Sequence, residues 1–149
     1  KRIMSLADPT KKMSKSDENP NGVVYILDDK DTIIRKFRRA VTDSDTEVRF
    51  AEGKDGVNNL MTVYSAFTGK NMEEIEREFA GKGYGDLKTA TGEVTADALA
   101  PVQKRFAELL ADKAGLEAMM KKGAETAAYF AQKTLSKVQR KLGFVARPR

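Results

Sequence analysis

Apolar side chains recur every three or four residues through most of the chain beyond position 30, and this spacing predicts helices. Asp31 or Thr32 is expected to cap the first helix, and Asn58 or Asn59 the second. The predicted helices cover residues 31–41, 58–69, 72–79, 99–110 and 116–142. The body of the protein is therefore predicted to be mainly α and to form a helical bundle.

Proline and glycine indicate where the later helices begin and end. Pro101 is expected either to start or to kink the fourth helix, because proline lacks the backbone N–H that a helix interior uses. Gly143 is expected to close the last helix. Gly81, Gly83 and Gly85 follow a predicted helix and do not form a G-x-G-x-x-G motif, so they indicate a helix end and tight turns rather than a phosphate-binding loop.

The first thirty residues follow a different pattern. Residues 2–7 alternate well enough for a short strand, and residues 11–22 form a loop rich in lysine and serine that ends in turn formers. Residues 23–27 are a short apolar run, and periodicity does not decide between a strand and a single turn. A lone strand has no partner in this chain, and an unpaired strand is a liability. We therefore interpret the sequence as the C-terminal piece of a longer fold.

The composition limits the chemistry that this chain performs. With 149 residues, 40% of them hydrophobic and 33% charged, the sequence is ordinary for a globular protein, and it has no apolar stretch long enough to cross a membrane. The chain has neither cysteine nor histidine, which removes most zinc sites and the usual nucleophile–histidine pairs. No metal site is predicted, and the lack of cysteine suits a cytoplasmic protein. The carboxylates of Asp28, Asp29 and Asp31 are expected to interact favourably with the positive N-terminal end of the following helix.

The positive charge is concentrated at the two ends of the sequence. Residues 1–16 hold five basic residues and one acidic residue, and residues 126–149 hold six basic residues and no acidic one. Residues 17–125 hold 16 basic and 21 acidic residues. Two basic ends beside an acidic body suggest a polyanionic partner.

The last predicted helix separates apolar from basic positions. Ala131, Leu135, Val138 and Leu142 share one seam at helical spacing. A basic stripe lies largely on a different face and consists of Lys133, Lys137, Arg140 and Lys141. Phosphate contacts from such a stripe would add affinity for a nucleic acid without reading its sequence, while the alternative is a solvated helix face. The basic residues among 35–39 can likewise be interpreted either as phosphate contacts or as a solvated helix face.

The pentapeptide Lys12-Met13-Ser14-Lys15-Ser16 carries the clearest chemistry. Two lysines three residues apart in a loop can converge on a triphosphate, while serine hydroxyls and free backbone N–H groups donate to the same oxygens. Such cations are useful where negative charge builds on a departing pyrophosphate. A solvated surface loop is the alternative reading of the same residues.

These residues spell the KMSKS signature of class I aminoacyl-tRNA synthetases, and the surrounding sequence resembles the tryptophanyl-tRNA synthetases. The resemblance extends in order over essentially the whole chain. It is carried by Arg2-Ile3-Met4-Ser5-Leu6, Asp8-Pro9-Thr10-Lys11, Asp31-Thr32-Ile33, Arg39-Ala40-Val41-Thr42-Asp43-Ser44, Gly56-Val57-Asn58-Asn59-Leu60 and Gly81-Lys82-Gly83-Tyr84-Gly85.

The resemblance implies a domain division and a nucleotide site. Residues 1–22 would be the C-terminal edge of a Rossmann-like catalytic domain, and residues 23–149 a helical domain of the anticodon-binding type. Lys12 and Lys15 would contact ATP phosphates as the catalytic lysines. Nucleotide-binding positions would also include Ile3, near the adenine, and the neighbouring Met13, Ser14 and Ser16.

The implied activity is ATP- and Mg²⁺-dependent activation of tryptophan and its transfer to tRNA(Trp), by a homodimeric parent protein. The isolated chain is expected to be inactive, because the tryptophan pocket and a histidine-containing signature of this family would lie outside it. Two alternatives stay open. One is the equivalent part of a class I synthetase for another amino acid, and the other is a free-standing helical RNA-binding module.

Overall fold

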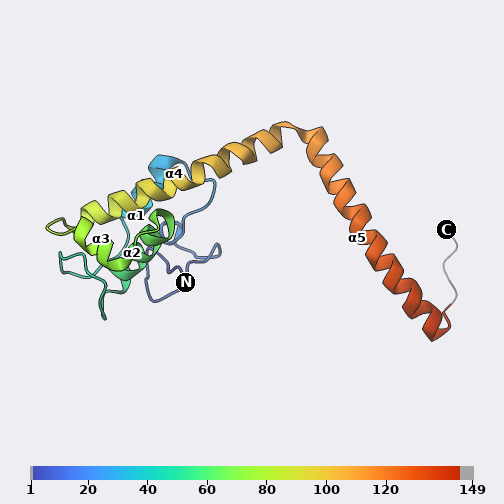
Figure 1. Ribbon diagram of the computed structural model, residues 1–149, viewed down its shortest axis with the longest axis horizontal. Helices are drawn as coiled ribbons and strands as arrows, with labels where there is room; N and C mark the ends of the chain where they lie inside the picture. The colour runs from blue at the N-terminus through green and yellow to red at the C-terminus, as the bar shows by residue number, and fades with distance from the viewer. Residues whose placement is uncertain (1, 145–149) are drawn as a thin grey trace. The chain divides into compact units, whose positions relative to one another are not determined.

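The computed structural model describes residues 2–144 and is built from helices (Figure 1). They are α1 (Lys30–Arg38), α2 (Asp55–Thr68), α3 (Met72–Glu78), α4 (Tyr84–Ala111) and α5 (Lys113–Leu142), with a short 3-10 turn at Pro20–Gly22. The prediction of a mainly α protein is confirmed. The chain divides into two compact units, the first ending at Lys104 and the second beginning at Arg105. In the described part, no helix combines the length and the apolar character that a membrane span requires.

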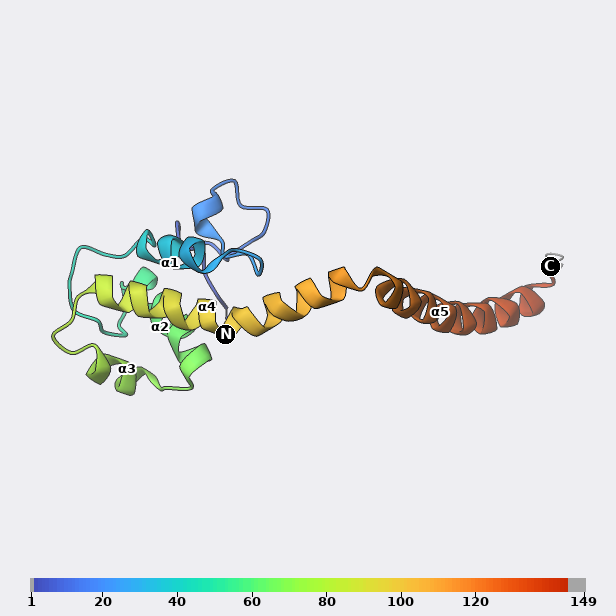
Figure 2. The ribbon, with the colours of Figure 1, turned by 90° about the horizontal axis from the view of Figure 1, so that it is seen from above.

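The first unit has one hydrophobic core to which all of its helices contribute. In Figure 2, α1 lies on one side of the first half of α4, and α2 and α3 lie on the other. The N-terminal segment joins this core through Leu6, which is only 2% exposed. The completely buried apolar side chains of the helices are Ile33, Val57, Leu60, Met61, Ile75 and Leu87.

α4 begins at Tyr84, so the predicted start near residue 99 is wrong. The missed portion is rich in small residues and threonine, and it has a weak apolar pattern for that reason. Thr91 is completely buried and donates its hydroxyl to the Leu87 carbonyl four residues earlier, 2.7 Å away, so it fits inside a helix without another partner. Pro101 lies within α4 and does not start it.

Gly92 allows α1 and α4 to approach each other closely. A Cβ atom added at Gly92 would lie 2.9 Å from Ile34 Cα and 3.4 Å from Phe37 Cβ, both in α1. Because one of these atoms belongs to the backbone, the contact cannot relax by a simple rotamer change. Packing against α1 therefore explains a glycine in the middle of α4.

The helix caps differ in part from the predicted ones. Asp29, rather than Asp31 or Thr32, caps α1, and its carboxylate accepts a hydrogen bond of 2.7 Å from the Thr32 N–H. α2 begins at Asp55 without a side-chain cap, so Asn58 and Asn59 lie inside the helix. The predicted caps of both helices are therefore wrong. Asn58 and Asn59 instead form hydrogen bonds to backbone groups outside α2.

The strand expected over residues 2–7 does not form. Within the described residues this segment makes an isolated antiparallel bridge, between Met4 and Lys12. A strand needs a ladder of bonds to a neighbour, and the part of the chain that the structure describes supplies one such pairing. The apolar run at 23–27 forms a turn, in which the Asp28 N–H donates to the Tyr25 carbonyl.

The described part of the second unit contains the end of α4 and the whole of α5. The Asp112 carboxylate caps α5 by accepting from the Gly115 N–H at 2.9 Å, and Gly143 closes it with a φ of 74°. The predicted glycine stop is thus confirmed. None of the α5 residues is buried within its own unit. An amphipathic pattern predicts the helix but cannot supply the surface against which it packs.

Two glycine-to-alanine substitutions in α4 are expected to have opposite effects on stability. Gly92→Ala should lower the free energy of unfolding by about 1–3 kcal/mol, because the new methyl group overlaps the α1 backbone. Gly85→Ala, where the added Cβ would meet no atom within 4 Å, should be neutral or raise it by up to about 1 kcal/mol. Urea unfolding followed by circular dichroism measures both. Equal effects at the two positions would contradict the close α1–α4 contact.

Candidate functional site

The lysine loop, residues 11–17, is held at its start by backbone hydrogen bonds to the N-terminal segment. The Met13 N–H donates to the Ile3 carbonyl at 3.1 Å, and the Ser5 N–H donates to the Lys11 carbonyl at 2.8 Å. Ile3 and Met13 are both half-buried and pack against the core of the first unit. Ile3 and Met13, two positions predicted to lie at the nucleotide, are therefore adjacent.

Asn59 in α2 connects this segment to the helices. Its side-chain amide accepts from the Met4 N–H and donates to the Met4 carbonyl, both at 2.9 Å, as a neighbouring strand would do. Asn59 is only 6% exposed. Losing it would leave partly buried backbone groups without partners, which is costly.

A tight turn forms the second half of the lysine loop. The Asp17 N–H donates to the Ser14 carbonyl at 3.1 Å, and this turn places Lys15 between its ends. Asp17 in turn accepts from the Ser5 hydroxyl at 3.3 Å. Gly22 lies against this pair, since an added Cβ would come within 2.5 Å of Ser5 Oγ and 2.8 Å of Asp17 Oδ2. The base of the turn is therefore packed while its tip is exposed.

Lys12 and Lys15 are both exposed, and among residues 2–144 neither has a carboxylate within ion-pair distance. Lys11 differs, because its ammonium group lies 3.0 Å from the Asp8 carboxylate. The Thr10 hydroxyl and then Lys11 lower the pKa of Asp8, and Asp8 raises the pKa of Lys11. The loop thus neutralises its first lysine and leaves the two signature lysines available for an outside anion.

Hydroxyl and backbone donors surround these two lysines. Ser14 and Ser16 are exposed, and the Ser16 N–H lies 3.3 Å from Ser14 Oγ. Ammonium, hydroxyl and amide groups are the donors that bind phosphate oxygens in proteins. The arrangement can therefore bind a polyphosphate through mobile cations.

The predicted basic stripe on α5 is exposed along its length, at Lys133, Lys137, Arg140 and Lys141. The basic cluster on α1 is only partly available. Lys36 is buried and lies 2.5 Å from the Asp28 carboxylate, so it serves the fold. Arg38 and Arg39 remain exposed.

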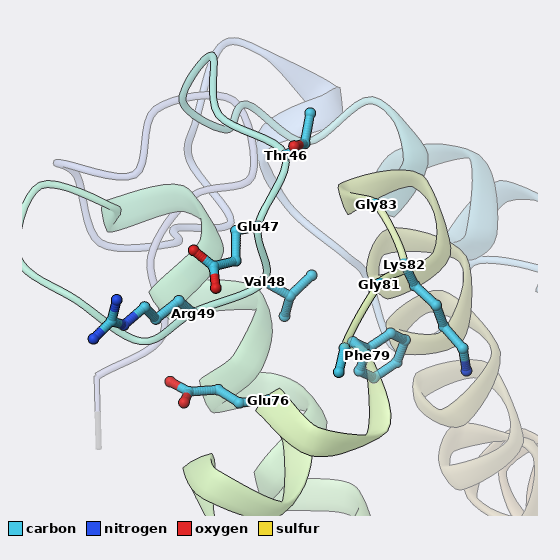
Figure 3. A pocket seen from close by; sticks show the side chains of 10 residues that line it. Thr46, Glu47, Val48, Arg49, Glu76, Phe79, Gly81, Lys82 and Gly83 are labelled. Carbon is cyan, nitrogen blue, oxygen red and sulfur yellow. The ribbon is translucent and has the colours of Figure 1, made fainter.

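A cavity of about 590 Å³ lies elsewhere in the first unit, between residues 46–49 and the segment that follows α3 (Figure 3). Glu47, Arg49 and Glu76 lie on one side of the view, and Phe79 and Lys82 lie on the other. No residue of the lysine loop lines it. Its mixed charge does not suit a triphosphate, which requires an excess of positive charge.

The family described as tRNA synthetases class I (W and Y) matches residues 1–100, a range that contains the lysine loop, its anchors and all of the first-unit core. The chain belongs to this family. Residues 12–16, which spell KMSKS, therefore lie within the part of the chain that the family matches.

Three known proteins illustrate how the chain relates to the family. It is 49% identical over 144 residues to a tryptophan–tRNA ligase from Clostridium tetani, which covers 97% of this chain and 43% of that relative. A crystal structure of tryptophanyl-tRNA synthetase from Mycoplasma pneumoniae matches with a TM-score of 0.79 and 34% identity, over 97% of this chain and 44% of that one. A tyrosyl-tRNA synthetase from Aeropyrum pernix matches with a TM-score of 0.57 and 26% identity, over 78% and 37%. The chain spans less than half of the length of each of these proteins.

Sequence reasoning predicted the exposed part of the candidate site and missed the residues that support it. Lys12, Lys15 and the serines between and after them follow from a contiguous motif. The role of Asn59 does not, because an asparagine near a helix start is equally typical of a cap. Its position in α2, 55 residues from Met4, becomes informative only when the fold brings the two together.

Removing the Asn59 amide should loosen the lysine loop selectively. Asn59→Ala is expected to speed hydrogen–deuterium exchange at the amides of Met4, Ser5 and Met13 and to lower the free energy of unfolding by about 1–3 kcal/mol. Asn58→Ala is the matched control, because Asn58 makes the same two bonds to the backbone of Ala51. It should lower stability similarly while leaving exchange in the lysine loop unchanged. Unchanged loop exchange in both variants would contradict the anchoring role.

Proposed function

We propose that this chain is part of a tryptophan–tRNA ligase, in which it supplies the phosphate-binding lysine loop and a helical portion that contacts tRNA. The observation that carries the proposal is the exposed Lys12 and Lys15, without carboxylate partners among residues 2–144, on a loop whose base is fixed. The 49% identity to a tryptophan–tRNA ligase across nearly the whole chain supports this choice of reaction.

The donors of the lysine loop suit ATP. Lys12 and Lys15 would bind the phosphates that leave as pyrophosphate, with help from the backbone of Met13 and the hydroxyls of Ser14 and Ser16. Ile3, paired to Met13, would lie near the adenine. The described residues contain no group of three His, Cys, Asp or Glu side chains arranged for a metal ion. Mg²⁺ would be held chiefly by the nucleotide phosphates, because it keeps several bound waters and needs few protein ligands.

In the proposed reaction, ATP supplies the α-phosphorus that the tryptophan carboxylate attacks, and pyrophosphate leaves. The two lysines neutralise the charge that builds on this leaving group, which is a stabilisation of the transition state more than of the bound substrate. Their exposure lets them follow the phosphates as charge moves. The anchored base of the loop keeps them within reach.

Transfer to tRNA(Trp) is the second proposed step, and the exposed basic stripe of α5 would contact the tRNA backbone. Such contacts position the nucleic acid without reading bases. The division at residue 22, the homodimeric state of the parent and its cytoplasmic location are proposals on the same basis. The isolated chain is expected to be inactive, because the residues that select tryptophan would lie in the part of the relatives that it does not match.

Lys15→Ala in the full-length protein should slow ATP–pyrophosphate exchange by about 10²–10³-fold, because one fixed donor to the leaving group is removed. Tryptophan affinity, measured without ATP, should change little. Lys11→Ala is the matched control, since Lys11 is also an exposed loop lysine but is paired with Asp8. Its exchange rate should stay close to that of the unaltered protein. An undiminished rate in Lys15→Ala would refute the role.

The two alternatives give different results in the same assay. The likeness to the Aeropyrum pernix structure makes a synthetase for tyrosine one alternative. Such an enzyme would show ATP–pyrophosphate exchange with tyrosine and not with tryptophan. A free-standing RNA-binding module would bind tRNA and show no exchange with any amino acid. Titration of ATP with Mg²⁺ into the full-length protein separates that module from both synthetases.

The α5 stripe should affect tRNA binding through charge alone. Replacing Lys137 and Arg140 by alanine is expected to weaken tRNA binding and to lower the slope of log affinity against log salt by about 1 for each phosphate that the protein no longer neutralises. Replacing Lys113 and Lys121, which lie on other faces of α5, removes the same charge and should leave that slope nearly unchanged. Filter binding at several salt concentrations measures both, and identical slopes in the two double variants would exclude a specific role for the stripe.

A further inference from the structure

Ser5 closes the lysine loop from both ends. Its N–H donates to the Lys11 carbonyl at 2.8 Å, and its hydroxyl donates to the Asp17 carboxylate at 3.3 Å. Ser5 is only 1% exposed, and its Oγ also accepts from the Ala7 N–H at 3.3 Å. A buried hydroxyl that both donates and accepts has one preferred orientation. The Ser5–Asp17 contact is therefore a fixed point at the base of the loop.

The Asp17 carboxylate holds the loop and does not neutralise a cation. Its Oδ2 accepts from the Ser5 hydroxyl, and its Oδ1 accepts from the Asn19 N–H at 3.0 Å. Among residues 2–144 Asp17 forms no ion pair, although Lys15 is only two positions away along the chain. Both of its oxygens are thus used to fix neighbouring segments, while the charge of Lys15 stays free for an outside anion.

The backbone of Asp17 fixes the turn that carries Lys15. The Asp17 N–H donates to the Ser14 carbonyl at 3.1 Å, so Lys15 and Ser16 are the two central residues of that turn. Asp17 therefore determines the shape of the turn through its N–H and the position of the turn through its carboxylate. A lysine on a positioned turn loses less conformational freedom when it binds a phosphate than a lysine on a free loop does.

Gly22 encloses the Ser5–Asp17 contact. Its carbonyl accepts from the Leu6 N–H at 3.0 Å, which brings the segment after the loop against the N-terminal segment. An added Cβ at Gly22 would lie 2.5 Å from Ser5 Oγ and 2.8 Å from Asp17 Oδ2. A side chain at this position would have to displace the two hydrogen-bonded groups. The contact is thus built into the packing and is not a chance meeting of surface side chains.

We propose that Asp17 is a positioning residue for Lys15 in the activation of tryptophan, and that it acts together with the buried Ser5 hydroxyl. The proposal rests on the proposed function of the lysine loop. The Ser5–Asp17 contact keeps the turn where the Lys15 ammonium group meets the departing pyrophosphate. Because Asp17 acts through Lys15, its loss slows the reaction only as far as Lys15 is misplaced.

The test is a double-variant cycle in the full-length protein, read by ATP–pyrophosphate exchange. Asp17→Ala alone should lower kcat about 10–100-fold, with much smaller changes in the KM for ATP and in tryptophan affinity, because a small misplacement of a catalytic group has a cost of this size. In the Lys15→Ala background the same substitution should lower kcat less than about threefold, because the group that Asp17 positions is already absent.

Two further variants disturb the contact without removing the carboxylate. Ser5→Ala removes the hydroxyl donor, and Gly22→Ala inserts a methyl group against the pair. Each should lower kcat about 3–30-fold and should lose most of this effect in the Lys15→Ala background. Thr95→Val is the matched control, because it removes a buried hydroxyl that donates to the Thr91 carbonyl within α4. Its kcat should stay close to that of the unaltered protein.

Two results overturn the proposal. One is an unchanged kcat in Asp17→Ala, and the other is an equal slowing with and without Lys15, which is expected of a residue that only stabilises the fold. If Asp17→Ala does not fold, the same two criteria apply to Ser5→Ala. Both results leave the proposed function standing as long as Lys15→Ala is slow. An undiminished rate in Lys15→Ala refutes the function of the loop and this proposal with it.

Discussion

The pair of hydrogen bonds between the Asn59 amide and the backbone of Met4 is the constraint on which the candidate site depends. Met4 forms the bridge to Lys12, and its neighbours Ile3 and Ser5 bond to Met13 and Lys11. Without Asn59 the Met4 N–H and carbonyl would lose these two partners. Asn59 supplies the pairing that a sheet would otherwise provide, and a loop with exposed cations is thereby held on a helical body.

The lysines of the first unit differ in their partners. Some form ion pairs that hold the fold together, and others remain available to bind an anion. Lys36 is buried against Asp28, and Lys54 is bonded to Asp45 and Tyr84, which together raise its pKa. These ammonium groups hold segments of the fold together. Lys12 and Lys15 have no such partners among the described residues, so an incoming polyanion would not have to displace a carboxylate before it binds.

α5 shows how one helix can present two kinds of surface. Its apolar positions and its basic stripe are separated by the helical repeat itself, so the two faces differ in the kind of surface that they can contact. The same property makes the helix dependent on context. A long amphipathic helix forms readily from its local pattern, yet its apolar side is satisfied only when another surface meets it.

The sequence by itself determined the mainly α character, the glycine end of α5 and the KMSKS motif with its exposed donors, because each of these follows from residues that are close together along the chain. Only the tertiary structure decided the early start of α4, the roles of Asn58 and Asn59, and the reduction of the expected strand to a single bridge. The stretch that contains Thr91 and Gly92 has a weak apolar pattern. The reason for a glycine at position 92 is its close contact with α1, which only the tertiary structure shows. Asn59 and Met4 are 55 residues apart, and a pairing over that distance depends on the packing of the whole first unit. Local spacing carries information about helices and motifs, whereas contacts between distant segments arise from burial, which no single stretch of sequence encodes.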